Sequence, residues 1–279
     1  MSAADLVRSG DLEGALETLQ GEIRREPADA KHRIFLFQLL VIMGQWERAV
    51  RQLQLIADLE PAALPMVQAY REAIRCELLR AEVFGGRRAP TLLGDPPQWV
   101  ALMIEALRLQ GDQQHAAAVE LRAEAFELAP ASGGELNGEN FEWIADADSR
   151  LGPIFEAFVN GRYYWIPFSA MAKLEIEQAS DLRDFAWIPG GVTLSNGGEL
   201  PALIPSRYPG SESHADGLVR LARKTLWEDG ADGRYTGYGQ RAVVTDRSEL
   251  ALLDIRNAAF DPSHPVSPDG VEAPAATDG

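Results

Sequence analysis

Apolar residues recur at every third or fourth position through residues 1–130, so they fall on one side of a helix. The series Leu12, Leu16, Leu19 and Ile23 is one example, and alanine, leucine, glutamate and arginine dominate the whole stretch. This spacing is typical of amphipathic helices, whose apolar side faces a core. The pattern therefore predicts that the first part of the chain is helical.

A short motif repeats within this helical part. The segment that begins at Gly10 recurs 34 residues later at Gly44, and again at Gly111. A period near 34 residues, with glycine between two helices, is typical of tetratricopeptide (TPR) repeats. The copy between residues 64 and 97 is degenerate and predicts one longer helix or a distorted pair. The sequence thus predicts a TPR-like helical repeat domain over residues 1–130.

Stacked repeats leave a concave face, lined by the first helix of each repeat. Such a face accepts a partner's helix or extended segment, or else it is solvated or packed against the rest of the chain. The sequence is compatible with both interpretations. The repeat register assigns seven residues to this candidate partner-binding face: Lys31, Ile34, Gln38, Glu72, Arg75, Glu105 and Arg108.

The pattern changes after residues 131–140, whose glycine and asparagine content predicts a linker. Residues 141–260 hold more aromatic and β-branched side chains, interrupted by turn signals at short intervals. Short apolar runs on both sides of a turn signal are typical of β-hairpins. Three candidate hairpin turns are Asn160-Gly161, Asn196-Gly197 and residues 246–249.

Hairpins in series predict a mainly antiparallel, small barrel-like domain over residues 141–260. One helix is expected at residues 215–225, where apolar residues share one face. Residues 261–279 are rich in proline, glycine and alanine, with little apolar content, and predict a disordered tail. The expected fold class is therefore α+β, with one or two helices in the second domain.

The net charge of −16 at pH 7 argues against non-specific binding to nucleic acid or to anionic membranes, because both carry the same sign. The single cysteine, Cys76, has no second cysteine with which to form an internal disulfide. No signal peptide and no apolar run of membrane-spanning length is evident. We therefore expect a cytoplasmic protein.

Arginine and aspartate recur among the turn and aromatic residues of the second domain. If they converge, the arginines could bind an anion, or the paired aspartates a hard cation. They could equally pair with one another in a structural network, and the acidity of the domain favours this second interpretation. The candidate cluster comprises Asp146, Asp148, Arg150, Arg162, Arg183, Arg207 and Arg241.

Motifs for common catalytic chemistry are missing from the sequence. The four histidines lack metal-ligand spacing, and there is no Gly-x-Ser-x-Gly elbow, Walker A loop or Rossmann glycine fingerprint. The sequence therefore predicts neither a cofactor nor an enzymatic activity.

The most unusual segment is residues 141–168, FEWIADADSRLGPIFEAFVNGRYYWIPF. Further motifs come after it: Asp181-Leu182-Arg183-Asp184 and Trp187, Ile204-Pro205-Ser206-Arg207-Tyr208-Pro209, Lys224-Thr225-Leu226-Trp227, and Gly239-Gln240-Arg241. In this order and spacing they resemble the ImpE/TagJ family, accessory proteins of bacterial type VI secretion systems. The resemblance extends over roughly residues 3–257.

The resemblance implies a non-enzymatic adaptor. Members of that family are associated with the small subunit of the contractile sheath, by binding its N-terminal helix, and with the AAA+ disassembly ATPase ClpV. A helical repeat array is compatible with holding an amphipathic helix. The alternative, which the arginines and aspartates motivate, is an anion-sensing or metal-dependent enzymatic module that uses the helical domain as a docking arm.

Overall fold

The computed structural model describes residues 1–229 and 235–261, in which helices come first and a large antiparallel sheet comes second. The predicted α+β class is therefore confirmed. We call residues 3–128 the helical part and residues 134–260 the sheet part. The helices of the helical part are α1 (Ala3–Ser9), α2 (Leu12–Arg25), α3 (Ala30–Ile42), α4 (Trp46–Leu59), α5 (Leu64–Phe84), α6 (Gln98–Gly111) and α7 (His115–Leu128).

The repeated motif marks the turn inside each helical pair. Gly10 and Gly44 have φ values of 85° and 65° between α1 and α2 and between α3 and α4, a conformation that glycine adopts without steric cost. In the third copy the equivalent residue is Gln113, with φ of 62°, because α6 continues to Gly111. The motif therefore predicted three helical pairs, but its third copy was aligned two residues too early.

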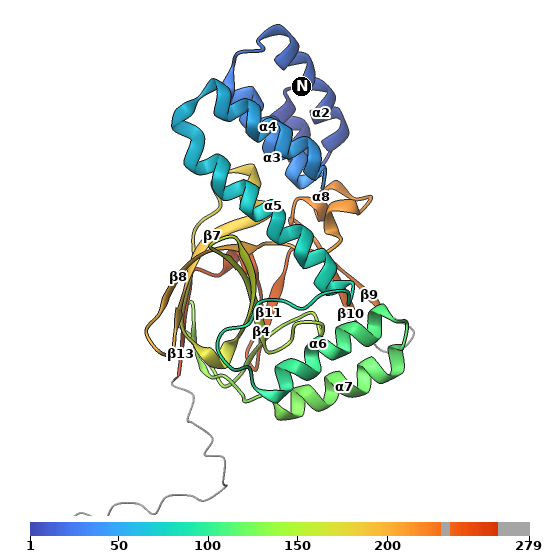
Figure 1. Ribbon diagram of the computed structural model, residues 1–279, viewed down its shortest axis with the longest axis vertical. Coiled ribbons are helices and arrows are strands. Elements are labelled where there is room, and N and C mark those ends of the chain that lie inside the picture. Colours follow the sequence, from blue (N-terminus) through green and yellow to red (C-terminus); the bar gives the residue numbers. More distant parts are fainter. Residues whose placement is uncertain (230–234, 262–279) are drawn as a thin grey trace, which may run out of the picture.

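The degenerate copy is one long helix, α5, rather than a distorted pair. It joins the α1–α4 group to the α6–α7 hairpin, and these lie at its opposite ends (Figure 1). Between α5 and α6 the chain crosses the edge of the sheet: the Thr91 N–H donates to the Tyr163 carbonyl (2.9 Å), and the Trp165 N–H donates to the Thr91 carbonyl (3.1 Å). The helical pairs therefore do not form the continuous stack that the repeat predicted.

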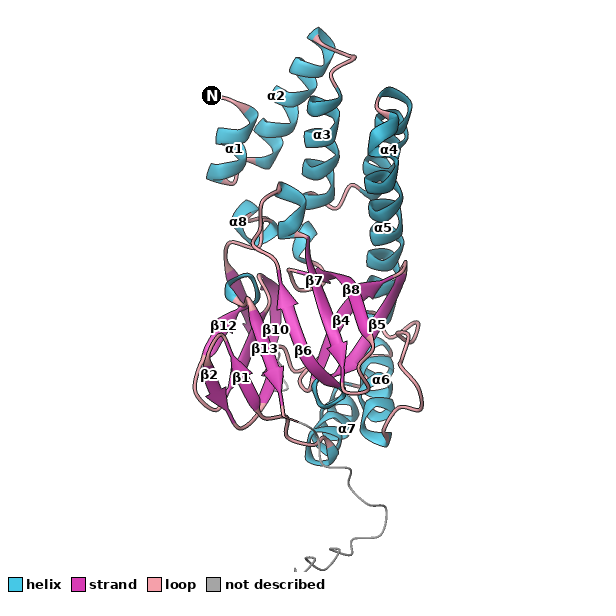
Figure 2. Cartoon of the chain, turned by 90° about the vertical axis from the view of Figure 1, so that its left-hand side faces the viewer, coloured by secondary structure: helices cyan, strands magenta, loops and turns pink. Residues whose placement is uncertain are grey.

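The sheet part contains an eight-stranded antiparallel sheet in the order β2-β1-β13-β6-β7-β8-β4-β5, a three-stranded sheet β12-β11-β3 and a two-stranded sheet β10-β9. Figure 2 shows α5, α6 and α7 beside the large sheet. The strands are β1 (Gly134–Leu136), β2 (Glu139–Phe141), β3 (Ile144–Asp146), β4 (Ile154–Val159), β5 (Arg162–Pro167), β6 (Met171–Ile176), β7 (Trp187–Leu194), β8 (Glu199–Pro205), β9 (Thr225–Asp229), β10 (Tyr235–Gly239), β11 (Ala242–Thr245), β12 (Glu249–Ala251) and β13 (Asn257–Phe260).

The three predicted hairpins are present as β4–β5, β7–β8 and β11–β12. At the first turn Asn160 and Gly161 have φ values of 48° and 71°, as a two-residue hairpin turn with two left-handed residues requires. The predicted barrel-like closure is wrong, because β2 and β5 remain the two edges of the large sheet within the described residues. The loop through Thr91 covers the β5 edge, so that this edge is protected without closure.

The predicted linker is also structured in part. It contains β1 and the start of β2, which form a hairpin around Asn137 and Gly138, with φ values of 51° and 90°. β1 also pairs with β13 near the end of the described chain. Composition predicted a linker here, but the local Asn-Gly turn signal was the better guide.

The helix expected at residues 215–225 is reduced to one turn, α8 (Gly217–Arg220). Ala222 has φ of 50° and interrupts the helical path, and the chain enters β9 at Thr225. The run of residues with helical apolar spacing was therefore too short to specify a longer helix. Apart from Asp261, the predicted tail at 261–279 lies outside the described residues.

The helical and sheet parts share a hydrophobic core. One cluster of buried side chains extends from the helices to Phe158, Trp165 and Trp187 of the sheet part, and a second cluster fills the sheet part itself. Burial of apolar surface stabilises a fold by about 25 cal/mol per Å², so this junction is a substantial contact. No helix among the described residues is long and apolar enough to cross a membrane.

Candidate docking groove and buried charge cluster

The centre of the junction is an ion pair between α5 and β4. Arg80 Nε and Nη2 donate to the two carboxylate oxygens of Glu156, at 2.7 and 2.6 Å. Arg80 Nη1 also donates to Glu77 Oε1 at 3.0 Å. Burial alone would lower the pKa of Arg80, but the carboxylates of Glu156 and Glu77 raise it well above its ordinary value. The guanidinium therefore stays charged although its side chain is 1% exposed.

A second buried arginine extends this cluster into the sheet part. Arg241 Nε and Nη2 donate to Asp146 Oδ2 at 3.1 and 2.9 Å, and Arg241 Nη1 lies 3.3 Å from Glu156 Oε1. Tyr208 Oη donates to Asp146 Oδ1 at 3.1 Å. Burial raises the pKa of Asp146 to about 6, although Arg241 acts in the opposite direction. The folded state therefore favours the protonated form of Asp146 more than an unfolded chain would.

Asp148 and Arg150 form a local pair beside this cluster. Arg150 Nη2 donates to Asp148 Oδ2 at 2.5 Å and its Nε donates to Oδ1 at 2.9 Å. The Gly237 N–H donates to the same carboxylate at 2.9 Å, and the Arg150 guanidinium lies over the Phe84 ring of α5. This pair therefore fixes the turn after β3 against both β10 and α5.

Arg207 joins the sheet part to α3 without a carboxylate. Its Nη1 and Nη2 atoms donate to the Ile42 and Val41 carbonyls, at 2.8 and 3.0 Å, and Nη1 also donates to the Arg220 carbonyl at 2.6 Å. The last carbonyls of a helix lack partners within the helix and carry partial negative charge. Burial lowers the pKa of Arg207, and these carbonyls supply the contacts that a buried guanidinium needs.

The structure brings together five of the seven members of the predicted arginine–aspartate cluster. Asp146, Asp148, Arg150, Arg207 and Arg241 are buried and hydrogen-bonded. Two members lie outside it: Arg183 pairs with Asp181 and lies over the Tyr70 ring, and Arg162 is exposed at the start of β5. Since the buried arginines already have partners, the geometry favours a structural network over an open site for an anion.

The seven predicted partner-binding residues lie on three helices. Lys31, Ile34 and Gln38 are on α3, Glu72 and Arg75 on α5, and Glu105 and Arg108 on α6.

They do not share one continuous face, because α3 and α6 lie at opposite ends of α5 (Figure 1). Gln38 is buried. Arg108 pairs with its own helix and turn, to Glu105 (2.7 Å) and Asp112 (2.6 Å). Glu72 lines a hollow between α5 and the sheet, and Arg75 is adjacent in sequence to Ile74, which lines a groove between α4 and α5.

The larger of two hollows beside α5 is a groove between α4 and α5, with a volume of about 500 Å³. We call it the α4–α5 groove. Its apolar walls include Val50 and Leu78, which are 38% and 48% exposed. The complete lining is Gly44, Gln45, Trp46, Glu47, Arg48, Val50, Ile74 and Leu78.

Sequence reasoning missed this groove because the repeat register assigned binding to the first helix of each pair. Leu78 occupies the position where the repeat pattern has glycine. This departure from the pattern was the one signal in the sequence that pointed to an apolar surface on α5.

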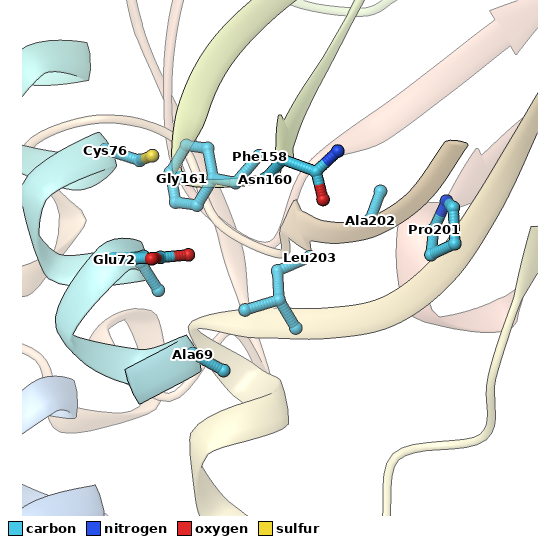
Figure 3. Close-up of a pocket in the computed structure, with 10 residues that line it drawn as sticks. Ala69, Glu72, Cys76, Phe158, Asn160, Gly161, Pro201, Ala202 and Leu203 are labelled. Atoms are coloured by element: carbon cyan, nitrogen blue, oxygen red, sulfur yellow. The ribbon is translucent and has the colours of Figure 1, made fainter. Parts of the chain in front are cut away.

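A second hollow of about 290 Å³ lies between α5 and the strands β4 and β8 (Figure 3). Glu72, Ala73 and Cys76 line it from α5, facing Phe158 and Leu203. Burial raises the pKa of Cys76 to about 12, so its thiol stays protonated and unreactive near neutral pH. The polar groups of this hollow therefore offer little chemistry.

One group of metal-ligand types also occurs at the turn before α3. Donor atoms of Glu26, Asp29 and His32 lie within 4.8 Å of one another. Asp29 is the N-cap of α3 and accepts a bond from the Lys31 N–H at 2.7 Å, which is an ordinary structural role. The sequence did not predict this group, because its three residues come from one turn rather than from spaced histidines.

The structure thus combines a helical scaffold that carries an apolar groove with a sheet to which buried paired charges fix it. The family model for ImpE protein matches residues 138–259. Over 263 residues, covering 94% of this chain and 92% of the relative, the sequence is 48% identical to the "Type VI secretion system accessory component TagJ" of Pseudomonas aeruginosa strain PAO1. The chain belongs to the ImpE family, and the resemblance seen in its motifs is confirmed.

The fold also matches a solved structure. The X-ray crystal structure of protein VPA1032 from Vibrio parahaemolyticus aligns with a TM-score of 0.85 and 27% sequence identity. The alignment covers 93% of this chain and 97% of that one. The combination of helical part and sheet part is therefore shared over nearly the whole chain.

Proposed function

We propose that this protein is a cytoplasmic, non-enzymatic adaptor of a bacterial type VI secretion system, and that it binds the N-terminal helix of the small sheath subunit. Its 48% identity to a TagJ accessory component supports the accessory role. The observation that carries the binding mode is the α4–α5 groove, whose apolar side chains are exposed between two helices.

An amphipathic helix fits this groove by its shape and by its chemistry. Side chains at every third or fourth position of such a helix form ridges that pack into the groove between two other helices. Trp46, Val50, Ile74 and Leu78 offer these ridges an apolar surface. Packing there removes the exposed faces of Val50 and Leu78 from water, which is the main favourable term in such docking.

Charge around the groove is mixed. Arg51 on α4 and Arg75 on α5 are 66% and 68% exposed, and they pair with Glu47 (4.0 Å) and Glu72 (3.7 Å). Each arginine is adjacent in sequence to a lining residue of the groove, and Glu47 itself is one of the lining residues. An acidic group on the partner helix would compete with these carboxylates for the arginines, so we expect charge to affect the association rate and the direction of the bound helix more than the affinity.

Fluorescence polarisation with a labelled peptide from the N-terminus of the cognate small sheath subunit tests this proposal, with the full-length protein. Leu78→Asp places a charge in the apolar wall, and we expect the affinity to fall by roughly 10-fold or more, as for a central interface residue. Arg75→Glu should weaken binding less, because it changes the rim.

The matched controls lie on the other helical hairpin. Leu128 on α7 is 50% exposed, so Leu128→Asp makes the same chemical change away from the groove, and Arg108→Glu repeats the charge reversal on α6. Both should leave the affinity unchanged. Absence of binding by the wild-type protein would refute the proposed partner, whereas equal losses in Leu78→Asp and Leu128→Asp would refute the groove.

We extend the proposal to sheath disassembly linked to the ATPase ClpV, because the family resemblance implies this ATPase. The affinity of purified ClpV for the same sheath peptide is measured with and without the protein. An unchanged affinity, together with no direct contact between ClpV and the protein, would remove ClpV from the proposal.

A further inference from the structure

The floor of the α4–α5 groove rests on the sheet part. Trp46, which lines the groove, stacks on Trp187, the first residue of β7, with 6.0 Å between ring centroids and 25° between ring planes. Tyr70 of α5 stacks on the same Trp187 ring at 6.2 Å. Trp187 is completely buried and does not line the groove. One side chain of the sheet part therefore supports both helices that form the walls.

Trp187 is itself held by the buried charge cluster. Its indole Nε1 donates to Glu77 Oε2 at 2.7 Å, and the other oxygen of Glu77 accepts from Arg80. Arg80 in turn holds Glu156 of β4 with two bonds. Contacts are therefore continuous from the groove floor to the charge cluster, and the angle of the Trp187 ring is fixed by a hydrogen bond as well as by packing.

The end of the groove is held at a second point. Arg207 donates to the Val41 and Ile42 carbonyls, which immediately precede the turn through Gly44 into α4. That turn supplies the first lining residues of the groove. Loss of the guanidinium would leave the Ile42 carbonyl without this partner, while the Val41 carbonyl would still accept from the Gly44 N–H (3.1 Å). The turn into α4 would therefore be held less firmly on the sheet part.

We infer that the sheet part sets the shape of the α4–α5 groove through Trp187 beneath Trp46 and Arg207 on the end of α3. Trp187 and Arg207 are thus positioning residues for a partner helix that neither of them touches. This inference rests on the proposed function for the identity of the ligand, while the coupling between groove and sheet is a property of the chain alone. It gives the sheet part a role beyond stability.

Hydrogen exchange of the free, full-length protein tests the coupling without any peptide. Trp187→Phe keeps a ring beneath Trp46 but removes the N–H, Trp187→Leu removes the ring as well, and Arg207→Lys keeps the charge but not the forked geometry. We expect amides in residues 44–50 to exchange faster in all three variants, with Trp187→Leu the fastest. The control is Trp143→Leu, just before β3 and 42% exposed, which should leave residues 44–50 unchanged.

Peptide affinity then shows whether the coupling reaches the ligand. We expect Trp187→Leu to weaken binding of the sheath peptide by about 2- to 10-fold, the contribution of one aromatic pair. In a double-mutant cycle, Trp46→Leu and Trp187→Leu should be strongly non-additive, because both remove the same stack.

The outcomes separate the two proposals. Unchanged exchange at residues 44–50 in Trp187→Leu would overturn this inference, as would an increase spread evenly over all helices. If the wild-type protein binds no sheath peptide while exchange at 44–50 still responds to Trp187, the proposed partner fails and the coupling stands. Peptide binding with additive effects of Trp46 and Trp187 would overturn the coupling and keep the partner.

Discussion

The hairpins α3–α4 and α6–α7 are built in the same way but are used differently. In each hairpin the turn contains a residue with positive φ, which is Gly44 in the first and Gln113 in the second. The next residue is in both cases a glutamine, which is the N-cap of the second helix but makes no side-chain cap bond. The α3–α4 hairpin leaves an open apolar groove next to α5. Both hairpins also contact the sheet part, the first through Trp46 on Trp187 and the second through Phe126 of α7, which lies close to Gly152. A repeat motif thus specifies a hairpin but not its neighbours.

The position of α5 and the path of the chain after it decide these neighbours. The C-terminal half of α5 is held to the sheet by Arg80, at the centre of the charge cluster. After α5, the loop through Thr91 runs along the β5 edge before α6 begins. The second hairpin therefore starts in a different place from the one that a continuous stack would give it. This difference between the two hairpins can be tested at three places in the chain.

Removing the anchor of α5 should have the largest effect. Arg80→Met removes the guanidinium from two buried carboxylates. Glu156 then keeps Arg241 and Tyr163, and among the described residues Glu77 keeps only the Trp187 N–H, so we expect a loss of about 3–5 kcal/mol in the free energy of unfolding. Arg108→Met, on α6, breaks an exposed pair and should cost less than about 1 kcal/mol. Urea denaturation followed by tryptophan fluorescence measures both. Similar losses in the two variants would mean that the cluster is not what fixes α5.

The pH dependence of the same cluster should give a somewhat smaller effect. Because burial raises the pKa of Asp146 from 3.8 to about 6, the folded state favours its protonated form, and this contribution is lost as the pH rises from about 4 to 6. The wild-type protein should lose about 2 kcal/mol relative to Asp146→Asn over that range. Unfolding free energies of both proteins at several pH values test this. A relative gain on raising the pH would show that Arg241 outweighs burial.

The matched turns of the two hairpins should give the smallest effects, with opposite signs. Gly44→Ala places a β-carbon at positive φ and 2.6 Å from Glu212 Cγ, so it should destabilise by at least about 1–2 kcal/mol. Gln113→Gly relieves the backbone strain but removes the contact between Gln113 Oε1 and His115 Nε2 (3.3 Å), and it should stabilise by up to about 1 kcal/mol. Thermal unfolding of the two variants gives the comparison. If both changes destabilise, the contact with His115 contributes more than the backbone strain costs.

Local signals in the sequence predicted much of the fold, but they did not predict contacts between residues that are far apart in the sequence. Asn160-Gly161 and Asn196-Gly197 each specified a hairpin, because a short turn depends on its own backbone preferences. The pairing of Asp148 with Arg150 was equally local. By contrast, Arg80 was overlooked, because it sits in an ordinary helical pattern and its partner Glu156 is 76 residues away. Its importance arises only from the packing of α5 on the sheet.

The position of Arg80 also affects the order in which the chain folds during its synthesis. The helices emerge from the ribosome first, since domains form from the N-terminus onward. Arg80 cannot form its ion pair until Glu156 has been translated, and the carbonyls at the end of α3 cannot be bonded until Arg207 has been translated. The helical part therefore makes its full set of native contacts only after most of the sheet has been translated. A nascent chain that stops after α7 would expose Arg80 and the surface of Trp46 that Trp187 later covers, which makes it a natural substrate for chaperones.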